Sequence, residues 1–210
     1  MVHIFHYHLS SGLPAPVFNR YLETLPPDIQ KKIKGYRQWQ DAERSLAGYI
    51  LLQKGLENLN LPPIDFSSLT YGEFRKPGLD NIHFNITHSG DFTVCAISKD
   101  QEVGIDIELI SDIPLGDFTE FFNATEWHGV LNAPDSMKAF YQLWTKKEAF
   151  LKLVGSGLNE PLHKVNIDKG LIHWSNQHFV LQEVDIDPLH VCHLCTAVPA
   201  PGFTISGVFL

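Results

Sequence analysis

The sequence predicts an α+β protein made of two halves that pack against each other. Apolar residues recur at helical spacing over 26–59 and again over 118–157, and stretches that alternate like strands follow each of these regions. With 210 residues the chain can bury a sizeable core. We therefore expect an N-terminal α/β half at 1–101 and a C-terminal α/β half at 102–210.

The first half is expected to open on a strand, because "MVHIFHYHLS" alternates apolar and polar residues. A helix follows over 26–59, where two prolines mark its start and "LPP" at 61–63 ends it. Its apolar positions at helical spacing are Leu46, Tyr49, Ile50 and Leu56. Residues 82–110 then read as a strand meander, with turn-forming clusters at 89–91 and 99–101.

The second half repeats this order. Helices are expected within 118–131 and 133–157, and Gly155 is expected to end the second one. The apolar stripe of that helix consists of Met137, Phe140, Leu143, Trp144, Phe150, Leu151 and Val154. From residue 164 onward, alternating stretches predict another small antiparallel sheet.

The composition excludes some classes of protein. A formal net charge of −8 argues against a nucleic-acid partner, and no stretch approaches the roughly 20 apolar residues of a membrane span. The N-terminus lacks the pattern of a signal peptide, so we expect a cytoplasmic protein, and its organisation suggests a monomer. The cationic segment 31–44 is either a solvated helix face or a site for a small anionic ligand or an acidic partner.

Three cysteines give no support to a disulfide framework. "HVCHLCTAV" contains a CxxC pair with histidines nearby, which is a pattern of metal and redox sites. The same stretch reads as a strand, in which residues three apart point to opposite faces. Cys192 and Cys195 would then share a metal ion only if the strand were broken between them.

"VGIDIELI", residues 103–110, places Asp106 and Glu108 in an otherwise apolar run. On a strand they project from one face, roughly 6–7 Å apart, while Ile105 and Ile107 take the opposite face. Two like charges at this spacing repel each other when partly buried. Either they lie at an exposed strand end, or a cation such as Mg²⁺ lies between them.

"WTKKEAFLK", residues 144–152, places Trp144, Glu148 and Lys152 along one helix face at i, i+4 spacing. The carboxylate, flanked by Lys147 and Lys152, either completes a metal site beside phosphate-binding lysines or forms an ordinary surface ion pair. Trp144 weighs against the surface pair, because a large aromatic side chain prefers partial burial. In "FNITHSG", residues 84–90, His88 is either a phosphate ligand or a simple turn residue.

Taken together, these stretches resemble the Sfp-type 4′-phosphopantetheinyl transferases. The resemblance covers about residues 28 to 160, and the combination of its GIDIE and WxxKE stretches is highly specific. The matching stretches are "DAERSLAG" at 41–48, "RKP" at 75–77, "FNITHSG" at 84–90, "VGIDIE" at 103–108, "FFNATE" at 121–126 and "WTKKEAFLK" at 144–152.

The resemblance implies an enzyme that transfers the phosphopantetheine arm of coenzyme A to a serine of an apo acyl, peptidyl or polyketide carrier protein and releases 3′,5′-ADP. It implies two similar α/β halves related by a pseudo-two-fold axis, with coenzyme A in the cleft between them. It also implies Mg²⁺ bound by Asp106, Glu108 and Glu148, with Asp106, Glu148 and Lys152 acting in catalysis. Glu148 is additionally a candidate to take the serine proton.

For coenzyme A, the resemblance implies contacts from one set of matching positions. These are Lys32, Arg44, Lys76, Pro77, Thr87, His88 and Lys152. The chain departs from many relatives at Arg75, which stands where they carry glycine before the Lys-Pro pair. Arg75 is therefore expected either to rearrange the adenine contact or to add a phosphate contact.

Two other classes of function remain open on the sequence alone. The first is a non-catalytic module that binds coenzyme A or a carrier protein. The second is a metal-dependent nucleotide hydrolase, which needs no protein acceptor. The intact set of Asp106, Glu108, Glu148 and Lys152 favours the transferase over a pure binding module.

Overall fold

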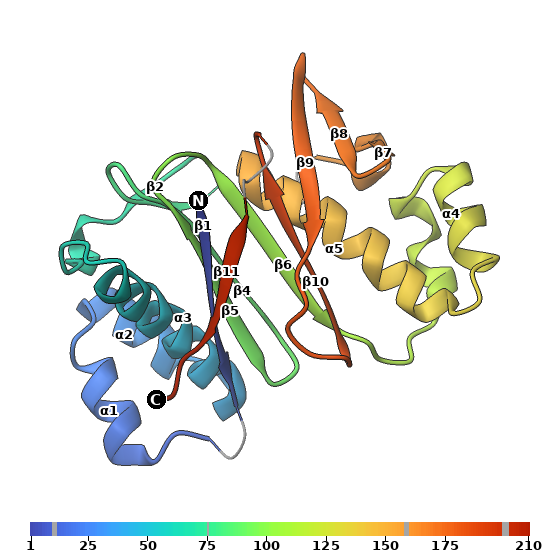
Figure 1. Ribbon diagram of the computed structural model, residues 1–210. Coiled ribbons are helices and arrows are strands. Elements are labelled where there is room, and N and C mark those ends of the chain that lie inside the picture. The colour runs from blue at the N-terminus through green and yellow to red at the C-terminus, as the bar shows by residue number, and fades with distance from the viewer. Residues whose placement is uncertain (10–11, 75, 158–159, 199–201) are drawn as a thin grey trace.

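Two β-sheets, each covered by one long helix, form the framework of the molecule (Figure 1). The computed structural model describes residues 1–9, 12–74, 76–157, 160–198 and 202–210. Within these residues, a four-stranded sheet has the order β11-β1-β5-β4 and a five-stranded sheet has the order β6-β10-β9-β8-β7. This arrangement confirms the predicted α+β class.

The first half carries most of the four-stranded sheet and three α-helices. Its helices and strands are β1 (Val2–His8), α1 (Ala15–Leu22), α2 (Pro27–Lys34), α3 (Trp39–Asn58), η1 (Phe66–Ser68), β2 (Thr70–Tyr71), β3 (Pro77–Gly78), β4 (His83–Ser89) and β5 (Phe92–Ser98). Strands β4 and β5 pair in antiparallel fashion, and β5 pairs with β1. The predicted opening strand is therefore confirmed.

The prediction of one continuous helix over 26–59 is wrong. Helix α2 ends at Lys34 with Gly35 as its C-cap, and α3 begins only at Trp39. Helix α1 was not predicted at all. Its signal is a proline in the first turn, a position where proline is tolerated, followed by apolar residues at helical spacing in "APVFNRYL".

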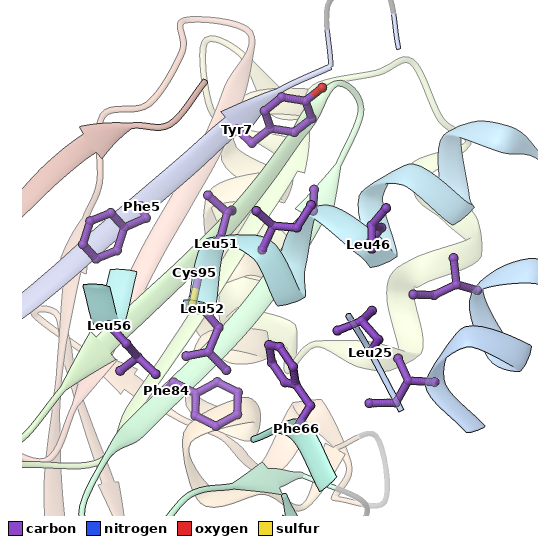
Figure 2. Packing of buried hydrophobic residues seen from close by; sticks show 14 of the residues in the cluster. Phe5, Tyr7, Leu25, Leu46, Leu51, Leu52, Leu56, Phe66, Phe84 and Cys95 are labelled. Carbon is purple, nitrogen blue, oxygen red and sulfur yellow. The ribbon is translucent and has the colours of Figure 1, made fainter. Parts of the chain in front are cut away.

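The core of the first half lies between α3 and the four-stranded sheet. Figure 2 shows leucines of α3, among them Leu51 and Leu56, directed toward Phe5 of β1 and Phe84 of β4. The predicted apolar positions Leu46, Ile50 and Leu56 are buried, whereas Tyr49 is only partly buried. Burial of this apolar face anchors α3 and thereby fixes the side chains on its other faces.

The second half places its longest helix against the five-stranded sheet. Its helices and strands are β6 (Val103–Leu109), η2 (Leu115–Phe121), α4 (Ala124–Leu131), α5 (Ser136–Val154), η4 (Leu162–Lys164), β7 (Ile167–Asp168), β8 (Leu171–Trp174), β9 (Gln177–Glu183), β10 (His190–Thr196) and β11 (Phe203–Gly207). Helix α5 starts at the side-chain cap of Asp135 and ends at Gly155, whose φ of 75° confirms the predicted terminator.

The meander predicted over 82–110 has the right strands but the wrong pairing. Strand β6 does not continue the sheet of β5; it pairs with β10 at the edge of the other sheet. Strand β10 is unbroken from His190 to Thr196, and Cys192 and Cys195 pack into different apolar clusters. The prediction that the two cysteines point to opposite faces is therefore confirmed.

The last described strand returns to the first sheet. Strand β11 pairs in parallel with β1, with Val2 opposite Phe203 and His6 opposite Gly207. The expected boundary at residue 101 falls between β5 and β6. The expected division assigns residues 203–207 to the second half, although β11 pairs with β1 in the sheet of the first half. The division into halves at 1–101 and 102–210 stays a prediction. Among the helices of the described residues, none combines the length and the apolar composition of a membrane span.

Gly104 allows α5 to lie directly on β6. A Cβ atom added at this position would stand 2.0 Å from the carbonyl oxygen of Ala149 and 2.5 Å from the amide nitrogen of Leu153. Both atoms belong to the backbone of α5, so no side chain can move to make room. The glycine therefore sets the distance between the helix and the strand that carry the acidic residues.

We predict that Gly104→Ala lowers the free energy of unfolding by about 2 kcal/mol or more, because the methyl group forces α5 away from β6. Gly129→Ala in α4 is the matched control, since nothing lies within 4 Å of its added Cβ. The control should be neutral or stabilise the protein by up to about 1 kcal/mol. Urea denaturation of both variants makes the measurement, and equal stability would contradict the prediction.

Candidate active site

Side chains of β4 connect the two sheets by bonding to the backbone of β6. Asn85 Oδ1 accepts a hydrogen bond from the amide of Ile105 at 3.0 Å. Thr87 Oγ1 accepts one from Ile107 at 3.4 Å, and Ser89 Oγ accepts one from Leu109 at 3.1 Å. These side chains alternate along β4, so they share one face. We call the contact of Asn85, Thr87 and Ser89 with β6 the polar seam.

Asp106 is buried at the polar seam beside a lysine. Its Oδ1 accepts hydrogen bonds from Lys152 Nζ at 2.5 Å and from Thr87 Oγ1 at 3.1 Å. Its Oδ2 is buried without a hydrogen-bond partner. Burial raises the pKa of the Asp106 carboxyl, and the positive charge of Lys152 opposes this rise.

Glu108 lies two residues further along β6 and is oriented by the next hydroxyl of the seam. Ser89 Oγ donates a hydrogen bond to Glu108 Oε2 at 2.6 Å. Burial and the negative charge of Asp106 raise the pKa of Glu108, while the bond from Ser89 opposes this rise. Ile105 and Ile107 are fully buried in the core, which confirms the predicted alternation of β6.

Glu148 of α5 is a neighbour of this pair. Burial, together with the charges of Asp106 and Glu108, raises the pKa of Glu148 to about 7, although the positive charge of Lys152 opposes this rise. Its Oε1 is buried without a hydrogen-bond partner. The structure thus brings Asp106, Glu108, Glu148 and Lys152 into one acidic cluster. Their roles in metal binding and catalysis, which the resemblance implies, stay predictions.

As the side chains lie, the acidic cluster does not form a closed metal site. Within the described ranges, no group of three or more His, Cys, Asp or Glu side chains is arranged so that it could hold a metal ion. Asp106 is directed to Lys152, and Glu108 to Ser89. Convergence of three carboxylates on one ion therefore stays a prediction, and it requires these side chains to turn.

Lys147 does not take part in the cluster, and the expectation that it helps to bind phosphate is wrong. Its side chain is fully buried, donates to Glu126 Oε2 at 2.7 Å and to the carbonyl of Leu162 at 2.9 Å, and lies over the ring of Phe122. Adjacent residues of a helix point about 100° apart, so Lys147 faces the interior when Glu148 faces the cluster.

Four residues predicted to bind coenzyme A line a single pocket of about 520 Å³: Lys32, Arg44, Pro77 and His88. The pocket lies where α2, α3 and β4 meet, and it also contains Tyr36, Tyr49 and Tyr71. Arg44 is held by the carbonyl of Gly90 at 2.5 Å and by Asp41 at 2.7 Å. The pocket therefore combines cationic groups with aromatic walls.

The other positions predicted to bind coenzyme A are Thr87, Lys76 and Lys152, and none of them lines this pocket. His88 and Thr87 point to opposite faces of β4, so Thr87 belongs to the acidic cluster and His88 to the pocket. Burial, Arg44 and Lys152 together lower the pKa of His88. Lys76 does not line this pocket; it donates to Glu102 and to the carbonyl of Leu153, both at 2.7 Å. Arg75 lies outside the described residues.

Sequence reasoning missed the three tyrosines of the pocket and the role of Ser89. Tyr36 carried a signal, because it lies in the cationic segment 31–44 and is followed by Arg37. Tyr71 has no cationic residue next to it in the sequence and carried no such signal. Ser89 carried a weaker signal, since it repeats the alternation of Asn85 and Thr87 along β4. Trp144, which was singled out, is partly buried among the rings of Phe118, Phe121, Phe122 and Phe140.

Comparison with known proteins decides the family. Residues 102–193 match the model of the 4′-phosphopantetheinyl transferase superfamily. The chain is 30% identical over 195 residues to 4′-phosphopantetheinyl transferase Sfp of Bacillus subtilis (strain 168), covering 86% of this chain and 85% of that protein. The chain belongs to the Sfp-type 4′-phosphopantetheinyl transferases. The resemblance inferred from its motifs is thereby confirmed.

Further members of this transferase family agree over most of the chain. The transferase gsp of Aneurinibacillus migulanus is 36% identical over 173 residues, covering 80% of this chain and 72% of that protein. The transferase ffp of Bacillus subtilis is 28% identical over 208 residues, covering 93% of this chain and 92% of that protein. The α+β fold described above is thus the fold of a phosphopantetheinyl transferase.

We predict that Lys147→Met lowers the free energy of unfolding by about 3 kcal/mol or more, because Glu126 would keep a largely buried charge without its partner. Lys138→Met, at an exposed position of the same helix, should change it by no more than about 0.5 kcal/mol. Guanidinium denaturation compares the two variants. If Lys147→Met lost catalysis but kept its stability, the result would contradict this prediction and support a role of Lys147 in the active site.

Proposed function

We propose that this protein transfers the 4′-phosphopantetheine arm of coenzyme A to a serine hydroxyl of an apo carrier protein and releases 3′,5′-ADP. The observation that carries the proposal is the acidic cluster with Lys152, which lies across β4 from a pocket with cationic groups and aromatic walls. Relatives that match most of the chain are named for this activity. A module that only binds coenzyme A has no use for such a cluster.

The pocket is the proposed site for the nucleotide part of coenzyme A. Lys32, Arg44 and His88 would contact the 3′-phosphate and pyrophosphate, because cationic donors form the strong hydrogen bonds that phosphates accept. The tyrosine walls and Pro77 suit the flat adenine ring. Lys76 would contact the phosphates after breaking its ion pair with Glu102. Thr87 and Lys152 would contact the pyrophosphate from the side of the acidic cluster.

We propose Mg²⁺ as the ion of the acidic cluster, held by Asp106, Glu108 and Glu148. The residues fit a hard cation: all donors are carboxylate oxygens, and the buried Asp106 Oδ2 and Glu148 Oε1 lack partners. Mutual repulsion in a desolvated setting also favours a cation among these groups. When bound, the ion would neutralise charge on the pyrophosphate and on the departing nucleotide.

The chain's own residues then have distinct tasks. Lys152 would place a positive charge beside the phosphate that is attacked, and positioning and charge neutralisation dominate phosphoryl-type transfer. Glu148 would accept the proton of the serine, and its raised pKa makes it a stronger base than an ordinary glutamate. A cation bound beside Glu148 would lower this pKa again. We also propose that the enzyme acts in the cytoplasm as a monomer.

The deciding experiment incubates the protein with coenzyme A, Mg²⁺ and an apo carrier protein. Mass spectrometry of the carrier should show a gain equal to one phosphopantetheine group. Release of 3′,5′-ADP without a carrier would indicate a hydrolase instead. Binding of coenzyme A without turnover on acyl, peptidyl and polyketide carriers would indicate a binding module, and either result would overturn the proposal.

We predict that Glu148→Gln slows transfer at least about 100-fold, because the amide neither takes a proton nor carries the charge that attracts a cation. The variant should keep its stability, since glutamine has the same shape. Glu120→Gln, at an exposed position outside the cluster, is the control and should match the wild type. Initial rates measured with one apo carrier protein at constant concentration show the effect. Wild-type turnover in Glu148→Gln would contradict the proposed roles of Glu148 in catalysis and cation binding.

We predict that Lys32→Ala raises the Michaelis constant for coenzyme A by about tenfold, which corresponds to loss of one charge-assisted hydrogen bond. The rate at saturating coenzyme A should change much less. Lys31→Ala is a close control, because Lys31 is the preceding residue of α2 and does not line the pocket. Equal Michaelis constants for coenzyme A in the two variants would contradict the proposal that this pocket binds its phosphates.

A further inference from the structure

The hairpin of β8 and β9 holds two histidines directly opposite each other. The strands are antiparallel, with His173 opposite His178 and Trp174 opposite Gln177. Ser175 and Asn176 connect them with positive φ angles of 49° and 63°. Two such residues make the tight turn that matches the twist of a hairpin, so the turn fixes the register of the pair.

The packing of the hairpin also fixes the face on which the two histidines lie. Ile172 and Phe179 are opposite partners in the same register, and both are buried against the second half. Because successive side chains of a strand alternate between faces, His173 and His178 must both project into solvent. Both are exposed.

The two imidazole rings point at one another. Their Nδ1 atoms lie 2.6 Å apart, the ring centroids are 4.5 Å apart, and the ring planes are perpendicular. A hydrogen bond between two neutral imidazoles needs one ring to donate and the other to accept. The side of each Nδ1 atom that carries either a proton or a lone pair therefore faces the same small region of space. A shared proton can occupy this region, and so can a metal ion when neither Nδ1 carries a proton.

We propose that His173 and His178 form a surface site for a divalent transition-metal ion, with Zn²⁺ as the representative ion. Imidazole nitrogen suits Zn²⁺, Cu²⁺ and Ni²⁺, whereas Mg²⁺ prefers oxygen ligands. Zn–N bonds of about 2.1 Å at a tetrahedral angle would need an Nδ1 separation of about 3.4 Å, so the rings must part by less than about 1 Å.

Water completes the coordination in this proposal. Among the described residues, no third His, Cys, Asp or Glu joins the pair in a group that could hold a metal. Two protein ligands make the site weaker than a structural zinc site, which has four. The ion would therefore be exchangeable, and it would be bound only while the imidazoles are unprotonated.

A bound ion would tie β8 to β9 at the base of their turn. This hairpin supports α5, because Trp174 and Phe179 both contact the ring of Phe150, at centroid distances of 5.6 and 5.0 Å. The proposed site is separate from the acidic cluster in its residues and its chemistry. It does not depend on the transferase activity proposed above.

The test titrates Zn²⁺ into the protein in the presence of excess Mg²⁺, which keeps the carboxylates of the acidic cluster occupied. Calorimetry should show a binding event that weakens at least tenfold in His178→Gln and equally in His173→Gln. The double variant should be no weaker than either single variant, because one ion needs both nitrogens. His128→Gln, an exposed histidine of α4, should bind like the wild type.

Ring-nitrogen NMR spectra identify the ligating atoms and use no activity measurement. Zn²⁺ should shift the Nδ1 resonances of His173 and His178 together, and addition of a chelator should reverse both shifts. Unchanged Zn²⁺ binding in His178→Gln would overturn the proposal. Single variants whose losses add in the double variant would do the same, because they would indicate two independent sites.

Discussion

The polar seam between β4 and β6 is the contact on which the arrangement of the molecule depends. Strand β6 forms a backbone ladder with β10 on one side only, so its amides at 105, 107 and 109 need acceptors on the other side. Side-chain oxygens of Asn85, Thr87 and Ser89 supply them. An unsatisfied buried amide costs about 1–3 kcal/mol, so the two sheets are held together at this line.

The same hydroxyl groups couple the fold to the chemistry. Thr87 and Ser89 accept from the backbone of β6 and donate to the carboxylates of Asp106 and Glu108. Each hydroxyl is thus fixed in its direction and orients one acidic side chain. Lys152 offsets part of the charge, and burial together with the remaining repulsion raises the pKa of Glu148. Repulsion among these buried carboxylates is unfavourable, and a cation bound among them would reduce it.

Local periodicity predicted those features of the fold that depend on neighbouring residues. The strands of 82–110, the end of α5 at Gly155 and the common face of Asp106 and Glu108 all follow from spacing along the chain. Helix α1 and the break at 35–38 were missed because a short helix and a short gap change the hydrophobic pattern little. The burial of Lys147 was missed because helical spacing was applied to Glu148 and Lys152 but not to Lys147, the residue directly before Glu148. Pairings such as β6 with β10 depend on distant residues, which local periodicity does not report.

Strand β11 has a consequence for how the protein is made. Strand β1 lies between β5 and β11, so one of its two partners comes from residues 203–207. During synthesis, residues 2–8 emerge before their parallel neighbour, which follows almost 200 residues later. At typical rates of about 5–20 residues per second, β1 would wait with one edge unpaired for about 10 s or longer. Exposed strand edges attract other chains, so ribosome-bound nascent chains of this protein offer a target for chaperones until β11 closes the sheet.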